Sequence, residues 1–260
     1  GILRMRRRAV FVTALFARLL GCLLACLLAG CHRGNPDALW NIVHGQCVPD
    51  QQQKGAPAPC AEVQIGDGEA RGYAVLKDRK GQYQHLLIPT TRLAGIESPE
   101  LLAPGAPNYF AEAWAARSFV EQRAGHPLPR TQLSAAINSA HGRSQEQLHI
   151  HVQCLRRDVA EALHAHLGEI GRSWAPLSVP LAGHRFRALR LADADLAGSN
   201  PFALLAASLP QGEGMGRHTL VLAGVDFEDG TPGFVLLDGR AALWPFDIGH
   251  GEDVQSQDCT

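Results

Sequence analysis

The stretch Gln147-Leu148-His149-Ile150-His151-Val152-Gln153 alternates strictly between polar and apolar residues. A period of two predicts a β-strand, and its apolar face, which Cys154 continues, can be buried in a core. The polar face carries His149 and His151, about 6–7 Å apart at the usual rise of a strand. A single strand histidine is most often structural. Two on one face indicate a functional site, because imidazole acts as a nucleophile, base or metal ligand near neutral pH.

The loop before this strand, residues 138–146, is rich in small and polar side chains. Such a loop, with Gly142, can direct backbone N–H groups at an anion, and Asn138 and Ser144 add neutral donors. Arg143 adds a guanidinium that suits phosphate oxygens. An ordinary hairpin turn explains the loop equally well when the loop is taken alone.

The first 30 residues have the pattern of an export signal. Met5 is followed by three arginines, and the apolar run Leu19 to Gly30 is short for a transmembrane helix but suits a signal core. The run ends in Leu28-Ala29-Gly30-Cys31, which resembles a bacterial lipobox, where cleavage precedes a lipidated cysteine. We expect lipidation of Cys31, and an uncleaved signal anchor is the alternative. Both place the rest of the chain in the periplasm, tethered to a membrane of the cell envelope.

Four cysteines follow the signal: Cys47, Cys60, Cys154 and Cys259. An even number in an oxidising compartment predicts two disulfides, with three possible pairings. We expect Cys47–Cys60, which closes a short loop rich in Gln and Pro, and Cys154–Cys259, which fastens the C-terminal tail to the histidine strand. A structural zinc site is the rival interpretation, but the chain has no Cys-x-x-Cys pair after the signal.

Length and charge limit the organisation of the chain. The net charge of −1 provides no basic field of the kind that nucleic-acid binding requires. About 230 residues remain after the signal, enough for one large domain or one domain with an appendage. We expect a signal at 1–30, an N-terminal segment with a disulfide loop at 31–65, a catalytic domain at 66–195 and a C-terminal lobe at 196–260 packed on it.

Apolar periodicity and turn signals predict an α+β fold. Residues 72–78 and 83–89 are expected to form a β-hairpin, and further strands are expected at 133–137, 184–191, 219–225 and 233–237. Helices are expected at 108–123 and 157–170, after residue 35, and from the Pro201 region through Ala207.

The loop and the histidine strand together resemble the histidine-triad superfamily of nucleotide hydrolases and transferases. That pattern is a Gly-x-Ser loop followed by His-φ-His-φ-His-φ-φ, where φ is apolar, and Gly142-Arg143-Ser144 and the stretch 147–153 match it. The resemblance implies a histidine-triad-like antiparallel sheet with helices. Gln147 stands where the pattern has its first histidine, and in the superfamily this position orients the nucleophile partly through its backbone carbonyl.

A more extensive resemblance covers nearly all of the chain after the signal. Cys47-Val48-Pro49, Pro59-Cys60-Ala61-Glu62-Val63, Gly72–Asp78, Ala136-Ile137-Asn138-Ser139 and the histidine strand resemble the bacterial CDP-diacylglycerol pyrophosphatases. This implies hydrolysis of CDP-diacylglycerol to CMP and phosphatidate at the membrane surface, by a monomer or homodimer. The implied chemistry is a double displacement through a nucleotidyl-histidine. No metal or other cofactor is expected, since fixed donors can neutralise the developing charge.

The resemblance also implies roles for individual residues. Spacing from Gly142 and Ser144 makes His149 the nucleophile and His151 the group that binds phosphate or protonates the leaving oxygen. A second register remains open, because His149-Ile150-His151-Val152-Gln153 resembles the nucleotidyl transferase branch, which would make His151 the nucleophile. The expected phosphate-binding residues are Asn138, Arg143, Ser144 and Gln147. Tyr73 and Lys77 are possible nucleotide contacts, although core packing and a solvated side chain explain them equally well.

Two other functions fit the same residues. The first is a nucleotidyl transferase that passes CMP to an acceptor other than water, since both reactions share the first step. The second is a lipoprotein that binds metal or ligand through His149 and His151 without chemistry.

Overall fold

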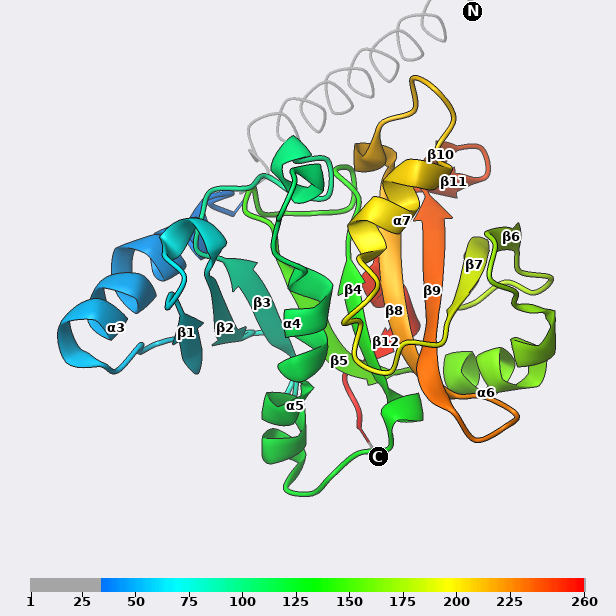
Figure 1. The fold of residues 1–260 in the computed structure, drawn as a ribbon, viewed down its shortest axis with the longest axis horizontal. Helices are drawn as coiled ribbons and strands as arrows, with labels where there is room; N and C mark the ends of the chain where they lie inside the picture. The colour runs from blue at the N-terminus through cyan, green and yellow to red at the C-terminus, as the bar shows by residue number, and fades with distance from the viewer. Residues whose placement is uncertain (1–33, 260) are drawn as a thin grey trace, which may run out of the picture. The chain divides into compact units, whose positions relative to one another are not determined.

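The computed structural model describes residues 34–259 of the chain (Figure 1). One compact unit begins at Pro36 and holds every helix and strand described below. The expectations for the signal at 1–30 and for lipidation of Cys31 lie outside the described residues. Within residues 34–259, no helix is both long enough and apolar enough to cross a membrane.

An antiparallel sheet of ten strands organises this unit. Its strands run in the order β1-β2-β3-β5-β4-β8-β9-β7-β6, and β12 pairs with β5 beyond the end of β3. The strands are β1 Glu62–Gln64, β2 Tyr73–Lys77, β3 His85–Pro89, β4 Leu133–Ile137, β5 Ile150–Leu155, β6 Ala175–Pro176, β7 Phe186–Leu191, β8 His218–Asp226, β9 Pro232–Arg240 and β12 Gln255–Ser256. A separate hairpin is formed by β10 Ala242–Leu243 and β11 Phe246–Asp247.

Helices cover both faces of the sheet. They are α2 Ala38–Ile42, η1 Val43–Cys47, α3 Val48–Lys54, α4 Tyr109–Ala115, α5 Arg117–Ala124, α6 Arg157–His166 and α7 Pro201–Ser208. Single turns of helix are η2 Glu69–Arg71, η3 Pro99–Leu102, η4 Arg130–Gln132, η5 Leu167–Glu169, η6 Met215–Arg217 and η7 Gly251–Val254. The elements α2, η1 and α3 follow one another without a break.

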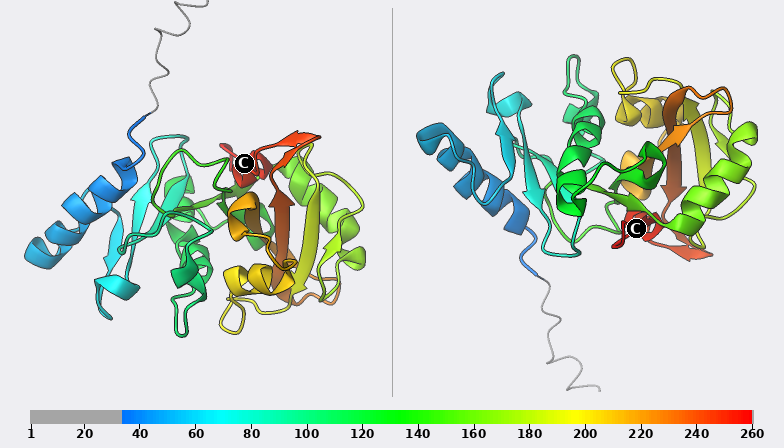
Figure 2. Two further views of the ribbon diagram at one scale, coloured as in Figure 1. Left: turned by 90° about the horizontal axis from the view of Figure 1, so that it is seen from above. Right: turned by 90° about the horizontal axis from the view of Figure 1, so that it is seen from below.

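One face of the sheet carries the main apolar core. Ile150 and Val152 of β5 lie in this core with residues of β4, β8 and β9, under side chains of α4, α5 and α7 such as Phe110 and Phe202. Burial of this face removes a large apolar area from water, which is the dominant favourable contribution to folding. Figure 2 shows the C-terminal segment on the opposite side of the sheet from α4, α5 and α7.

The opposite face carries two smaller apolar clusters with a polar strip between them. One cluster joins η1 and α3 to β2 and β3, and the other joins α6 to β7, β8 and β9. His149, His151, Gln153 and Ser134 lie in the interval and are all buried. The C-terminal segment, η7 and β12, lies against this strip, where Gln255 donates to Ser134 Oγ at 3.0 Å and Glu252 lies 3.1 Å from His151.

Most predicted elements are confirmed, including the α+β fold and the hairpin of β2 and β3. Both predicted disulfides are present, Cys47–Cys60 and Cys154–Cys259. The predicted helix at 108–123 is divided between α4 and α5 at Ala116. The predicted strand at 147–153 begins only at Ile150, and its polar face is buried because the C-terminal segment covers it.

The predicted boundary near residue 195 falls between strands of the same sheet. β7 precedes that boundary, and β8 and β9 follow it, yet β9 pairs with both β7 and β8. The described part of the predicted C-terminal lobe is therefore connected to the predicted catalytic segment through the backbone of the sheet.

Candidate active site

His149 lies directly before β5 and is 7% exposed. Its Nδ1 is 2.7 Å from the carbonyl oxygen of Gln147. A carbonyl only accepts hydrogen bonds, so Nδ1 carries the proton and Nε2 keeps its lone pair. Burial lowers the pKa of His149, which keeps the ring neutral at neutral pH. The ring is thus fixed in the tautomer that a nucleophile requires.

Gln147 holds this geometry through both its backbone and its side chain. Its amide nitrogen donates to the carbonyls of Pro89 and Thr91, at 3.0 and 2.9 Å, and its side-chain oxygen accepts from the N–H of Leu93 at 3.4 Å. The side chain is completely buried. Both amide hydrogens are therefore used by the protein itself, and the backbone carbonyl is the part of Gln147 that reaches a histidine.

His151 lies two residues further on, with its ring centroid 4.9 Å from that of His149. Its Nδ1 is 2.5 Å from Gln84 Nε2 and 3.1 Å from Glu252 Oε1. Its Nε2 is buried and has no hydrogen-bond partner among the described residues. Burial lowers the pKa of His151 to about 3, against the opposing effect of the Glu252 carboxylate. A buried nitrogen without a partner is the atom of this ring most suited to contact a bound ligand.

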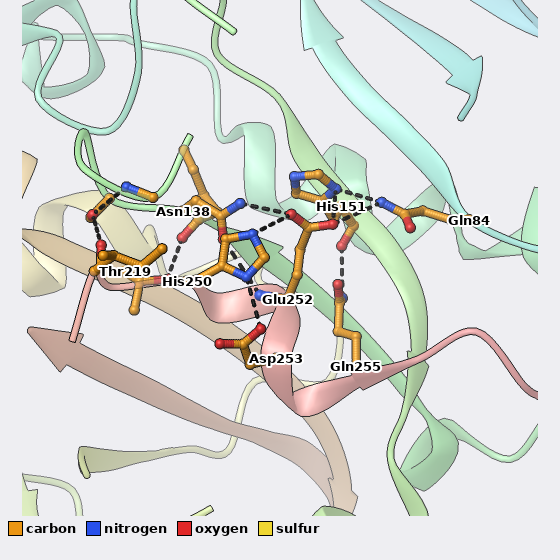
Figure 3. Close-up of polar contacts among 12 residues, drawn as sticks. Gln84, Asn138, His151, Thr219, His250, Glu252, Asp253 and Gln255 are labelled. Carbon is orange, nitrogen blue, oxygen red and sulfur yellow. Dashed lines mark hydrogen bonds and ion pairs between the residues drawn. The ribbon is translucent and has the colours of Figure 1, made fainter. Parts of the chain in front are cut away.

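Glu252 of η7 connects the elements around His151 (Figure 3). Its carboxylate accepts from Asn138 Nδ2 at 2.8 Å and from Gln84 Nε2 at 3.3 Å, and lies 3.2 Å from His250 Nε2. Burial opposes its ionisation, but the hydrogen bond from His250, the neighbouring His151 and the Asn138 amide hold the pKa of Glu252 well below its usual range. Glu252 is therefore a carboxylate that can stabilise positive charge on His151.

A line of alternating carboxylates and imidazoles continues from Glu252 toward the surface. His250 Nδ1 lies 2.9 Å from Asp253 Oδ1, and Asp253 Oδ2 lies 3.0 Å from His184 Nε2. His184 Nδ1 lies 2.7 Å from Asp247 Oδ2. Contacts with Glu252, together with Asp253 and against the effect of burial, raise the pKa of His250 to about 9. His250 is accordingly a cation at neutral pH and balances the charge of Glu252.

Two glycines allow the C-terminal segment to approach this closely. A Cβ atom on Gly251 would lie 2.5 Å from Thr219 Oγ1 and 3.1 Å from Val221 Cγ2. Gly249 has a φ of +67°, in the left-handed region that favours glycine, and its Cβ would lie 2.8 Å from Ser139 Cβ. The sequence Gly249-His250-Gly251-Glu252 therefore brings a charged segment against β8 and the 138–142 loop.

Glu252, His250 and Gln84 were not predicted as site residues. His250 and Glu252 come from an irregular segment and a single helical turn, where apolar periodicity gives no signal. Gln84 belongs to the predicted strand 83–89, where nothing distinguishes it from an ordinary polar strand residue. The predicted Cys154–Cys259 disulfide was the one indication in the sequence that the C-terminal segment approaches the site. It places the residues just before Cys259 beside the histidine strand.

The predicted phosphate-binding loop lies beside His149. Asn138 and Arg143 line a hollow of about 10 Å³ next to His149, with Gly95 and Leu148. That volume is about enough for one water molecule. Arg143 is paired with Glu97 and Glu146, each at 2.7–2.8 Å, and these carboxylates outweigh burial and raise its pKa. A phosphate at this hollow would therefore have to displace or rearrange these carboxylates.

The backbone of the loop is largely used within the protein. Ser139 Oγ accepts from the N–H groups of His141 and Gly142, both at 3.1 Å, and the Ser139 carbonyl accepts from the N–H of Arg143. Ser144 is exposed at the surface of the same loop. The N–H groups of His141, Gly142 and Arg143 therefore form hydrogen bonds within the loop and do not point to an anion site.

Tyr73 and Lys77 do not lie with the two histidines. Cross-strand partners share a face, and the register pairs Leu86 with both Leu76 and His151. Because side chains alternate along β2, Tyr73 and Lys77 project from the other face. Tyr73 donates to Glu62 at 3.3 Å, and Lys77 donates to the carbonyls of Asp78 and Gly81.

A larger cavity, about 620 Å³ in volume, lies toward the other end of β5. Leu155, Leu163, Leu167 and Val225 form part of its lining, and neither His149 nor His151 borders it. Among residues 34–259, no group of three or more His, Cys, Asp or Glu side chains is arranged to hold a metal ion.

The fold and the site define an α+β protein with two buried histidines, one held by a carbonyl and one beside a carboxylate, an arrangement suited to nucleophilic and acid–base catalysis. The sequence profile of a family described as CDP-diacylglycerol pyrophosphatase matches residues 34–260. A curated protein named CDP-diacylglycerol pyrophosphatase, from Yersinia pestis, is 44% identical over 226 residues, which cover 86% of this chain and 84% of that relative. The chain belongs to the CDP-diacylglycerol pyrophosphatase family. This confirms the predicted family and the predicted class of enzyme, a diphosphatase.

Proposed function

We propose that this protein hydrolyses the pyrophosphate bond of CDP-diacylglycerol to CMP and phosphatidate through a covalent intermediate on His149. Family membership supports the substrate and the products. The contact between His149 Nδ1 and the Gln147 carbonyl supports His149 as the nucleophile, because it leaves Nε2 unprotonated in a neutral ring. The same contact supports the histidine-triad register in which Gln147 replaces the first histidine.

In the first step, the lone pair of His149 Nε2 attacks the phosphorus that bears cytidine. The bond from this phosphorus to the bridging oxygen breaks, and phosphatidate leaves with the electron pair. The ring of His149 becomes positively charged, and the Gln147 carbonyl stabilises that charge through the Nδ1 hydrogen bond. His151, through its unpartnered Nε2, donates a hydrogen bond to the departing oxygen when Nε2 carries the proton.

In the second step, water attacks the same phosphorus and the bond to His149 Nε2 breaks. CMP is released and His149 regains its lone pair. A proton of the attacking water passes to Nε2 of His151, in the tautomer that carries its own proton on Nδ1, 3.1 Å from the Glu252 carboxylate. Glu252 stabilises the resulting cation, which then releases its extra proton to solvent. The double displacement divides one difficult reaction into two easier ones.

The neighbours of His149 have supporting roles in this proposal. Asn138 is held by Glu252 and borders the hollow beside His149, so its amide can contact a phosphate oxygen. Arg143 borders the same hollow, and approach of a phosphate would replace one of its two carboxylate partners. Ser144 remains a candidate donor from the exposed side of the loop, while Gln147 acts through its carbonyl.

We also propose that the catalytic part lies in the periplasm and is tethered to a membrane through lipidated Cys31 or a signal anchor. Two disulfides support an oxidising compartment. Such a location suits a substrate whose pyrophosphate lies at the surface of a bilayer. A monomer and a homodimer are both compatible with this arrangement.

The test is release of CMP from CDP-diacylglycerol in detergent, with EDTA present, by the wild type and by three histidine-to-alanine variants. We expect His149→Ala to reduce the rate by at least about 10³-fold, and His151→Ala to leave a larger residual rate. His164→Ala is the matched control, because His164 is an exposed histidine of α6. Absence of CMP from the wild type would overturn the assignment, and a strong dependence on His151 with an active His149→Ala variant would move the nucleophile to His151.

A further inference from the structure

The hairpin of β10 and β11 exposes a group of large apolar side chains at its tip. Leu243 is 90% exposed, Trp244 92% and Phe246 76%, while Leu102 and Ile248 are the other exposed large hydrophobic residues of the described chain, at 45% and 39%. Leu243 pairs with Phe246, so Trp244 and Pro245 form the turn. Single exposed apolar residues are ordinary, but a contiguous group usually marks a surface that binds something.

The base of this hairpin is fixed to the site. Asp247 of β11 contacts His184 at 2.7 Å. Ser139 Oγ donates to the carbonyl of Ile248 at 2.5 Å, and the Ser139 N–H donates to the carbonyl of Gly249 at 2.9 Å. The hairpin is therefore attached to the loop that begins at Asn138, and the chain continues from it through His250 to Glu252.

The hairpin of β10 and β11 lies at the end of the sheet to which β9 points (Figure 1). β9 ends at Arg240, just before the hairpin, and its register pairs Asp238 with Leu220, which in turn pairs with Ile137 at the end of β4. Ala136 of β4 pairs with His151, near the start of β5. A flat surface held against the hairpin tip would thus face the end of the sheet where the phosphate-binding loop lies.

We propose that the tip of this hairpin, Leu243 to Phe246, inserts into the boundary between headgroups and acyl chains of a lipid bilayer. The proposal rests on the proposed function, because that function places the substrate in a bilayer. Trp is enriched at this depth of membranes, since its ring is apolar and its N–H is polar. Docking by the hairpin would present the end of the sheet that carries His149 to the pyrophosphate of a lipid that remains in the membrane.

The size of the patch favours a bilayer over a second copy of the chain. An aromatic side chain offers about 150–250 Å² of surface, so the two aromatic tip residues and the smaller Leu243 offer roughly 500 Å² together. A stable protein interface buries about 800 Å² on each partner. A protruding tip of this kind suits insertion into a bilayer, where a few apolar side chains can be buried among the acyl chains without a large complementary surface.

The first test measures contact of Trp244 with lipid in the full chain. Fluorescence of wild type and Trp244→Phe is recorded on phosphatidylcholine vesicles whose acyl chains carry bromine, and the difference isolates Trp244. We expect brominated vesicles to quench the fluorescence of Trp244 by at least about half. Attachment of the chain to the vesicle through its N-terminal segment would not by itself bring bromine into contact with Trp244. Trp174→Phe is the control, because Trp174 is partly buried and donates to the Leu204 carbonyl. Equal difference signals on brominated and ordinary vesicles would overturn the proposal.

The second test separates docking from chemistry. CMP release is measured on vesicles containing long-chain CDP-diacylglycerol and on a short-chain CDP-diacylglycerol dissolved as monomers. For Trp244→Ser/Phe246→Ser we expect the ratio of the vesicle rate to the monomer rate to fall by about tenfold, with little change for Leu102→Ser. An unchanged ratio would overturn the docking proposal, and so would a dimer in solution that the double variant dissociates. No CMP from monomeric substrate with the wild type would instead overturn the proposed function.

Discussion

His151 Nδ1 lies 3.1 Å from Glu252 Oε1, and this contact joins the histidine strand to a helical turn near the C-terminus. Asn138 donates to the other carboxylate oxygen at 2.8 Å. The position of Glu252 therefore links His151 to the loop beside His149. In the proposed mechanism this link decides how readily His151 gains and releases a proton.

Replacement of Glu252 by Gln tests that link. The carboxylate raises the pKa of His151, so the amide should make the imidazolium still less stable. We expect the rate of CMP release to fall by about 10²-fold, with little change in KM and with a changed pH profile. Asp253→Asn is the matched control, because Asp253 contacts His250 and His184. A Glu252→Gln enzyme within about threefold of the wild type would contradict the assigned role.

The two disulfides should have separable effects. Cys154–Cys259 closes a separation of 105 residues and holds β12 and η7 near His151, whereas Cys47–Cys60 closes 13 residues next to α3. Chain-entropy estimates give about 4–5 kcal/mol for the first and about 3 kcal/mol for the second. We expect Cys154→Ser/Cys259→Ser to lower both Tm and kcat, and Cys47→Ser/Cys60→Ser to lower Tm with kcat retained. Equal loss of kcat in both variants would argue against a role for the C-terminal segment in catalysis.

The pairing of His250 with Glu252 predicts a pH dependence of stability. The pKa of His250 is raised to about 9 in the folded protein, from an ordinary value of about 6.5. Its contribution is therefore complete below about pH 6.5 and disappears as the pH rises through about 9. We expect His250→Gln to reduce the free energy of unfolding by about 2 kcal/mol at pH 6 and by much less at pH 10. The same difference at both pH values in urea denaturation would show that the ring acts through packing instead.

Gly251 tests the approach of η7 without removing a functional group. A Cβ here would meet Thr219 and Val221, so Gly251→Ala should displace Glu252. We expect a loss of about 1–3 kcal/mol in stability and at least about tenfold in kcat. Gly171→Ala is the matched control, since a Cβ at Gly171 meets no atom within 4 Å. Retention of full activity by Gly251→Ala would mean that the site tolerates movement of this turn.

The sequence predicted the parts of the site that depend on local pattern. Alternation around His149 and His151 located the strand and its core face, and an even cysteine count in a chain that was expected to be exported led to the prediction of both disulfides. Glu252 and Gln84 could not be found in this way, because tertiary packing alone brings them to His151. Tyr73 and Lys77 were named as possible nucleotide contacts, but they lie on the face of the sheet opposite to His151. The register between strands decides this, and the sequence of a single strand does not reveal it.

The division of the predicted helix at Ala116 had no sequence signal either. Neither Gly nor Pro occurs between Tyr109 and Ala124, and the chain reads as one amphipathic segment. In the folded protein α4 and α5 both contact the core, where Trp114 packs edge-on against Phe234. The break at Ala116 therefore follows from the shape of the core that the two helices cover, and not from the helix propensity of the residues.

Isolation of the covalent intermediate tests the central claim most directly. CDP-diacylglycerol labelled in cytidine is mixed with wild-type enzyme, the reaction is stopped within milliseconds under alkaline conditions, which preserve phosphohistidine-type bonds, and the labelled peptide is sequenced by mass spectrometry. We predict CMP attached to His149, and no labelled peptide from His149→Ala. Label on His151, or rapid turnover by the wild type without any labelled histidine, would contradict the assignment of His149 as the nucleophile.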